Sequence, residues 1–245
     1  LFPPQLLECL PEFILWVIAW IGCFTVGQIG FFTTLRSIEA SRMSSLLGLK
    51  ILVLAMICVL FAGTPLSGLQ WFAVLLSTVA AVGMNWSGGA HFTRKGLFWL
   101  LVTLIAYSLT DMVETRLVLL PKSGNIIRDS FAIGTVCYAV LGILTLPLLA
   151  RFRWSTRQFV KAAPFAVSWY LSQVALFVCF GLLGTVFGNV IQASRGLISI
   201  ALGILLLHYG FGRLDARISR AMWLRRAAAA ILMAAGIILY SLAKL

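Results

Sequence analysis

The sequence predicts an all-α membrane protein, a bundle of about eight transmembrane helices. Of its 245 residues, 61% are hydrophobic and 11% are charged, whereas a soluble domain carries roughly 25% charged residues. The mean hydropathy is +1.03, so the apolar surface is too large for one water-soluble core to bury. Successive apolar runs also reach the length of about 20 residues that a bilayer-spanning helix needs.

Eight apolar runs, separated by polar breaks, define the expected spans. The runs show no sustained alternation of apolar and polar residues and are too long for barrel strands. Because backbone groups in lipid need hydrogen-bond partners within their own segment, each run is expected to be a helix. In chain order, the expected spans lie at roughly 11–33, 37–62, 69–87, 97–119, 131–150, 164–185, 189–212 and 223–243.

Basic residues in the breaks fall unevenly on the two sides of this bundle. One side carries Arg36, Arg42, Arg94, Lys95, Arg151, Arg153, Arg157, Lys161, Arg213, Arg217, Arg220, Arg225 and Arg226. The other side carries Lys122, Arg128 and Lys244. Because short loops rich in Lys and Arg stay cytoplasmic, these charges place both termini outside. The net charge of +12 therefore reflects membrane orientation, and no nucleic-acid partner is expected.

The chain offers no pattern of an enzyme active site or a metal site. Its cysteines stand singly in or beside apolar runs, without a CxxC pair or metal-ligand spacing to histidine; they are Cys9, Cys23, Cys58, Cys137 and Cys179. No nucleophile elbow or phosphate-binding loop is present. We therefore expect no catalysis and no cofactor.

An internal repeat appears when the chain is compared with itself at an offset of 153 residues. The coincidences are Pro11 with Pro164, Trp16 with Trp169, Phe24 with Phe177, residues 40–42 with 193–195, and Gly83 with Gly236. Two helices precede the second copy but not the first. If the halves are alike, two helices are missing before Leu1, and the parent has five spans per half. An odd number of spans inverts the second copy, an arrangement that secondary transporters share.

The stretch from Asn189 to Gly196 (NVIQASRG), with Trp223 and Gly236, is similar to the last two helices of EamA-like transporters of the drug/metabolite transporter superfamily. The stretch Leu49-Lys50-Ile51-Leu52, with Leu66-Ser67 and Gln70-Trp71, resembles a helix and loop of nucleotide-sugar transporters in that superfamily. In span order and loop lengths, the resemblance covers essentially the whole chain. Residues 1–95 would form an incomplete first repeat of three spans, and 96–245 a second repeat of five.

The resemblance implies a secondary permease of the cell membrane that moves a small organic metabolite by alternating access, with possible proton or ion coupling. An exporter of nucleotide sugars or amphipathic drugs is the alternative within the superfamily. A membrane-embedded scaffold and a lipid-acting enzyme are alternatives of another class. Family members commonly have cytoplasmic termini, which is the reverse of the orientation that the loop charges indicate.

Ionisable residues inside a span cost roughly 2.5–3.5 kcal/mol on insertion scales and are functional candidates for that reason. Lys50 lies in the second expected span, where it either meets an anionic or carbonyl-bearing solute or extends its stem to the interface. Asp111 lies past the middle of the fourth span and would suit proton coupling, because a carboxyl group in an apolar environment holds its proton firmly. Glu114 and Arg116 are expected to belong to a helix-end charge cluster.

Polar and aromatic residues of the sixth and seventh spans complete the predicted binding site. Tyr170 and Gln173 share a helical face beside the repeated Trp169, and they would contact a planar or sugar-like solute. Further polar residues at steps of three follow on one face of the seventh span: Asn189, Gln192 and Arg195. For both groups, tight packing between helices is the alternative interpretation.

Overall fold

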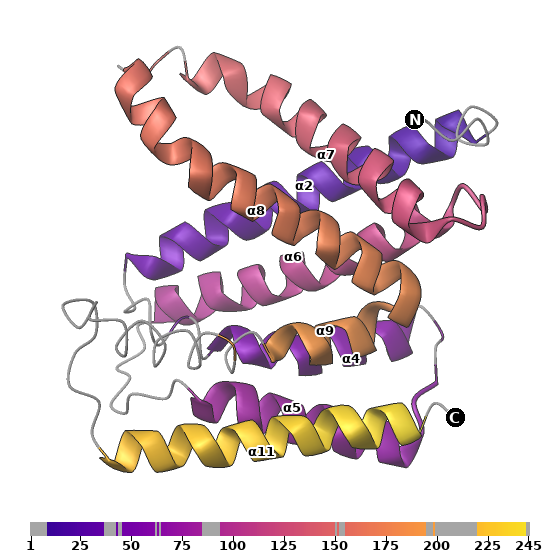
Figure 1. Cartoon of the computed structure of the whole chain (residues 1–245), viewed down its shortest axis with the longest axis vertical. Coiled ribbons are helices and arrows are strands. Elements are labelled where there is room, and N and C mark those ends of the chain that lie inside the picture. Colours follow the sequence, from indigo (N-terminus) through magenta and orange to yellow (C-terminus); the bar gives the residue numbers. More distant parts are fainter. Residues whose placement is uncertain are drawn as a thin grey trace. The chain divides into compact units, whose positions relative to one another are not determined.

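The computed structural model of the chain is built of helices, and the residues it describes contain no strand (Figure 1). The structure describes residues 9–36, 43, 46–61, 63, 65–84, 94–149, 151, 155–194, 198 and 220–243. Its elements are α2 (Leu10–Leu35), the 3₁₀ helix η1 (Leu47–Leu49), α4 (Lys50–Phe61), α5 (Gly68–Met84), α6 (Arg94–Leu119), α7 (Ile126–Leu149), α8 (Thr156–Leu183), α9 (Thr185–Ala193) and α11 (Arg220–Leu242). The predicted all-helical fold is confirmed.

Four of the described helices, α2, α6, α7 and α8, are long and apolar enough to cross a bilayer, judged by length and composition. Their outer faces carry large apolar side chains that are mostly exposed, such as Leu15 (63%) and Phe165 (73%). Water would solvate such surfaces poorly, whereas lipid covers them without cost. The chain is therefore a membrane protein.

The helices form two compact units, and each unit draws on separate parts of the chain. Unit 1 consists of residues 1–25 and 109–185, and unit 2 of residues 26–108 and 186–245. The long helices α2 and α6 contribute residues to both units. Each unit thus contains residues of both predicted repeats, and the repeats themselves stay a prediction.

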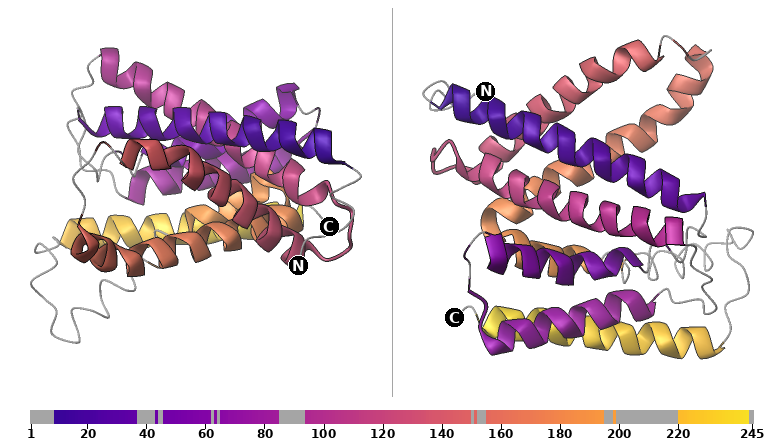
Figure 2. Two further views of the ribbon diagram at one scale, coloured as in Figure 1. Left: turned by 90° about the horizontal axis from the view of Figure 1, so that it is seen from above. Right: turned by 180° about the vertical axis from the view of Figure 1, so that it is seen from behind.

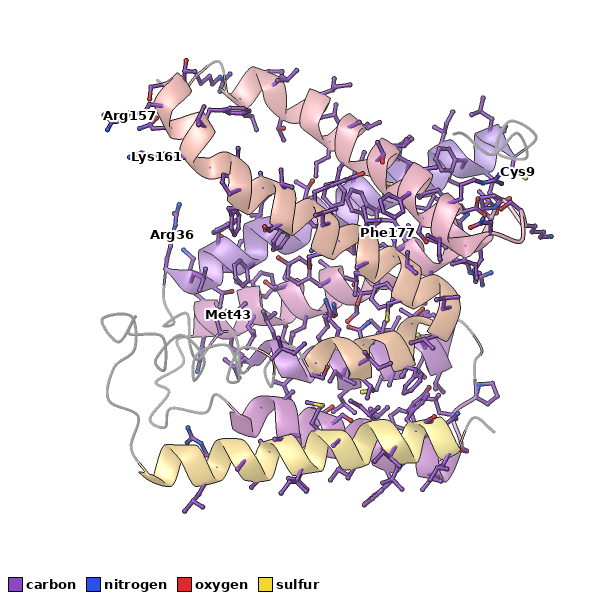
Figure 3. The ribbon with its side chains drawn as sticks, in the orientation of Figure 1. Cys9, Arg36, Met43, Arg157, Lys161 and Phe177 are labelled. Carbon is purple, nitrogen blue, oxygen red and sulfur yellow. The ribbon has the colours of Figure 1, made fainter. Side chains whose placement is uncertain are left out.

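In unit 1, an apolar core is formed where α2, the second half of α6, α7 and α8 meet. α7 and α8 lie against each other, as Figure 2 also shows. The buried core residues are Phe13, Val17, Trp20, Val113, Leu117, Val118, Ile133, Cys137 and Phe177. Figure 3 marks Phe177 on α8, and it marks Arg157 and Lys161 projecting outward from the first turns of the same helix.

In unit 2, α11 lies along α5 (Figures 1 and 2). Gly236 of α11 approaches so closely that a Cβ there would lie 3.2 Å from the carbonyl oxygen of Ala73 in α5. Tyr240 stacks on Phe187 of α9, with ring centroids 5.0 Å apart and planes 7° from parallel. Small residues thus allow the two helices to touch, and aromatic stacking joins α9 to them.

Two helices of the structure begin with reciprocal caps that the sequence encodes locally. At the start of α8, the Gln158 N–H donates to Ser155 Oγ at 3.4 Å, and the Ser155 N–H donates to Gln158 Oε1 at 3.3 Å. At the start of α5, Ser67 and Gln70 form the same pair of bonds. Such boxes satisfy backbone donors that a helix start leaves open.

Hydroxyl side chains inside the helices bond back to their own helix. Thr34 Oγ1 donates to the Gly30 carbonyl at 2.8 Å, and Ser108 Oγ donates to the Leu104 carbonyl at 2.7 Å. Both side chains are fully buried. Because these hydroxyls find acceptors within their own segment, their hydrogen-bonding needs can be met in an apolar environment.

Gly184 ends α8 in a backbone conformation, φ 82° and ψ 166°, that is essentially confined to glycine. We expect Gly184→Ala to destabilise the protein by about 1–3 kcal/mol, because the added Cβ strains this conformation. Gly142→Ala is the matched control, since a Cβ at this exposed helical position would meet no atom within 4 Å. Thermal unfolding in detergent should show a lower midpoint than that of the parent protein for Gly184→Ala. The midpoint of Gly142→Ala should not be lower than that of the parent. Equal midpoints would contradict the argument.

Candidate functional site

Five aromatic side chains of unit 1 form a continuous group, here called the aromatic cluster: Trp20 and Phe24 of α2, Tyr138 of α7, and Tyr170 and Phe177 of α8. Trp20 is central. Its ring stacks on Phe24 with centroids 5.0 Å apart and meets Tyr138 edge-on at 5.2 Å. Phe177 lies 6.2 Å from Trp20, and Tyr170 lies 6.2 Å from Tyr138. Three helices are therefore joined through contacts between rings.

A buried carboxylate adjoins the aromatic cluster. The Trp20 indole Nε1 donates a hydrogen bond of 2.9 Å to Glu114 Oε1 of α6. Glu114 is 2% exposed and Trp20 is 0% exposed. Surroundings of low dielectric constant strengthen a hydrogen bond. Trp20 thus fixes the position of the carboxylate against the rings.

The five rings of the aromatic cluster are buried to different degrees. Trp20 and Phe177 are fully buried, whereas Phe24, Tyr138 and Tyr170 are half-buried. The Tyr170 hydroxyl shares a hydrogen bond of 2.6 Å with the hydroxyl of Thr135, an exposed residue of α7. The accessible surface of the aromatic cluster therefore comes from Phe24, Tyr138 and Tyr170.

Asp111, a predicted site residue, lies one helical turn before Glu114 and is 4% exposed. Residues three apart share a helical face, so unit 1 contains two buried carboxyl groups on one side of α6. The structure differs from the sequence interpretation of Glu114 as part of a helix-end charge cluster, because its side chain is buried against Trp20. Arg116, by contrast, is exposed.

The predicted pair Tyr170 and Gln173 lies on α8, and both side chains are half-buried. Tyr170 belongs to the aromatic cluster, and Gln173 follows on the same helical face, between Tyr170 and Phe177. Trp169 is 43% exposed and stacks on Phe165, with centroids 6.3 Å apart. The structure thus brings Tyr170 to other aromatic rings of the cluster, whereas Trp169 contacts an exposed ring of its own helix.

The remaining predicted site residues belong to unit 2 or lie outside the described residues. Lys50 is half-buried at the first residue of α4, directly after η1. Asn189 is 2% exposed, and Gln192 is half-buried one turn further along α9. Arg195 lies outside the described residues.

Sequence reasoning did not select Trp20 or Tyr138 as site residues. The hydrogen bond that reveals Trp20 joins residues 94 positions apart, and no local spacing reports such a contact. A weak signal did exist for the aromatic cluster, because the repeat register pairs Phe24 with Phe177, and both rings are members.

No protein-family model matches the sequence, and no curated protein matches it. A solved structure titled "Crystal structure of protein" is similar to this chain, with a TM-score of 0.55 and 16% sequence identity. The match covers 93% of this chain and 76% of that one. At this identity, the likeness shows the fold alone.

Proposed function

We propose that the chain is a secondary transporter that carries a small organic solute across a cell membrane, and that the solute binds at the aromatic cluster with Glu114 and Asp111. The buried carboxylate beside Trp20 carries this proposal. An ionisable group in a membrane span is expensive to insert. Replacing buried ionic groups by apolar ones is often neutral or stabilising, so packing alone gives little reason to keep a carboxylate there.

The resemblance to EamA-like transporters supports the same proposal. It implies alternating access by two inverted repeats, 1–95 and 96–245, with eight spans in this chain. The four long apolar helices and the short apolar ones at 47–61, 68–83 and 227–242 are compatible with that plan. In other transporters with inverted repeats, discontinuous helices form the substrate site near the bilayer midplane.

The orientation proposed from the loop charges has a direct test. Gly124 lies in the exposed turn between α6 and α7, and Arg157 is exposed in the first turn of α8, so α7 separates them. We expect Gly124→Cys to react with a membrane-impermeant maleimide on intact cells, and Arg157→Cys to react only after permeabilisation. Labelling should be compared with that of the parent chain, which carries five cysteines. The reverse pattern would favour cytoplasmic termini, and equal labelling of both would contradict a spanning α7.

Transport itself is tested with the protein in proteoliposomes and a panel of labelled cationic, anionic and neutral solutes. We expect saturable flux of at least one solute, and Gln173→Ala should reduce it several-fold because Gln173 lies beside the rings that contact the solute. The neighbouring Ser172→Ala is the control, since Ser172 is exposed and faces another direction. Lys50→Gln tests the predicted contribution from unit 2. No flux above empty liposomes for any solute would overturn the proposal.

A further inference from the structure

We infer that the first half of α8 binds an anionic phospholipid, whose headgroup is attracted by Arg157 and Lys161 and whose acyl chain lies along Phe165 and Trp169. These four residues follow one another at steps of four and are here called the α8 stripe. The inference goes beyond the proposed transport function and does not depend on it. It rests on the length of α8, on its charges and on the exposure of the α8 stripe.

The helix α8 is longer than the apolar layer of a bilayer. It has 28 residues, which corresponds to a length of about 42 Å at a rise of about 1.5 Å per residue. The hydrocarbon core of a bilayer is about 30 Å thick. Both charged residues of the helix, Arg157 and Lys161, lie near its beginning, whereas its last turn is apolar. The surplus length of roughly two turns therefore places these two residues at the level of the lipid headgroups.

The two basic side chains have no acidic neighbour in the sequence. Both are exposed, and Figure 3 shows them projecting from the same side of α8. The sequence contains no Asp or Glu from residue 130 to residue 214, so neither the turn before α8 nor α8 itself supplies an acid to neutralise them. Because residues four apart are neighbours on a helix surface, both charges can approach one headgroup phosphate. The loop charges also predict that this end of α8 faces the cytoplasm, where the anionic lipids of a cell membrane lie.

After the charges, the α8 stripe continues with two stacked aromatic rings. Phe165 is 73% exposed and Trp169 is 43% exposed. The two ring planes are 29° from parallel, with centroids 6.3 Å apart. Together the rings expose a broad apolar surface, which lipid chains cover more favourably than water does. A phospholipid has a charged headgroup followed by an apolar chain, and the α8 stripe presents partners for both in the same order.

The helix α2, which the predicted repeat matches with α8, has a different partner beside its tryptophan. At the offset of 153 residues, Trp16 matches Trp169, and Glu12 matches Phe165. The Trp16 N–H donates to Glu12 at 3.2 Å, so an acid replaces the ring one turn before the tryptophan. An acid at this position would repel an anionic lipid. The combination of basic residues and stacked rings is therefore a property of α8 and not of the repeat.

Quenching of tryptophan fluorescence by brominated lipids tests the inference in nanodiscs, where both leaflets have the same composition. The discs contain phosphatidylcholine with a low, equal fraction of phosphatidylglycerol or phosphatidylcholine that is brominated on its acyl chains. The chain has eight tryptophans, so the contribution of Trp169 is the difference between the parent and Trp169→Phe. We expect the anionic lipid to quench this contribution several-fold more strongly. This corresponds to a preference of about tenfold, or about 1.4 kcal/mol, for the anionic headgroup.

Variants connect the preference to the two charges. The double variant Arg157→Gln with Lys161→Gln should lose the preference, so that both brominated lipids quench Trp169 equally. Arg116→Gln with Lys122→Gln is the matched control, because it removes two exposed basic side chains outside the α8 stripe, and it should keep the preference. Added salt should reduce the preference of the parent, because it screens exposed charges. Unfolding midpoints show that each variant is folded.

The inference fails if the two brominated lipids quench Trp169 equally in the parent, or if the first double variant keeps the preference. It also fails if neither lipid quenches Trp169, since the α8 stripe would then not contact lipid chains. Loss of the preference in the control variant would mean that the overall positive charge attracts the lipid, and this result would overturn the inference as well. None of these outcomes bears on transport, which the proteoliposome assay tests separately.

Discussion

Replacing Trp20 with alanine is expected to lower the free energy of unfolding by about 3–5 kcal/mol, the usual cost of truncating a buried tryptophan. Trp20 is fully buried and contacts Phe24, Tyr138 and Phe177. The variant would leave a space among these rings and would also remove the N–H that bonds to Glu114. The measurement is the unfolding transition in detergent, compared with that of the parent protein.

Two further variants separate the packing of Trp20 from its hydrogen bond. Trp20→Phe keeps most of the ring and removes the donor, so it should cost about 1–3 kcal/mol, the penalty for a buried acceptor that loses a bond. Trp16→Ala is the control on the same helix: Trp16 also donates to a glutamate, but it is half-buried and its partner is exposed. It should cost much less than Trp20→Ala. Equal losses at both tryptophans would contradict the central position of Trp20.

The long spans were predictable because apolar composition over about 20 residues leaves few alternatives to a helix in lipid. The expected runs at 11–33 and 97–119 match α2 (Leu10–Leu35) and α6 (Arg94–Leu119) closely. The spans expected at 37–62 and 189–212 are described only in part. In the first of these, a 3₁₀ turn precedes α4. The helix α9 begins at Thr185, directly after Gly184, and so starts before the residue 189 that the sequence predicted.

The starts of two helices were predicted too late. The sequence placed one start at Pro164, but α8 begins at Thr156, since the cap of Ser155 and Gln158 allows the helix to form through polar residues. Likewise, α7 begins at Ile126 rather than 131, where the Asn125 side chain accepts a hydrogen bond from the Arg128 N–H at 3.0 Å. Hydropathy reports where a helix is apolar, whereas capping decides where it begins.

The candidate site was only partly predictable, for a similar reason. Helical spacing placed Tyr170 and Gln173 on one face, and the cost of a buried charge singled out Asp111. Neither rule reveals which side chain of another helix will meet them. The partners Trp20 and Tyr138 are apolar or aromatic residues in apolar runs, and only the packing of α2 and α7 within unit 1 distinguishes them from residues that face lipid.

In unit 2, the predicted repeat pairs Gly83 of α5 with Gly236 of α11, but the surroundings of the two glycines differ. A Cβ at Gly236 would collide with Ser77 Oγ and lie 3.2 Å from the Ala73 carbonyl oxygen. A Cβ at Gly83 would meet no atom within 4 Å. Matching positions in the repeat thus have different surroundings, and the close approach of α11 to α5 depends on one glycine of the pair.

Gly236→Leu is therefore expected to destabilise the protein by about 1–3 kcal/mol, or more if α5 and α11 separate, because overpacking forces backbone shifts. Gly83→Leu should be neutral or slightly stabilising, since leucine favours a helix over glycine by roughly 0.5–1 kcal/mol. Unfolding of both variants in one detergent supplies the comparison. Equal changes in stability for the two variants would mean that the close contact of α5 with α11 at Gly236 contributes little to stability.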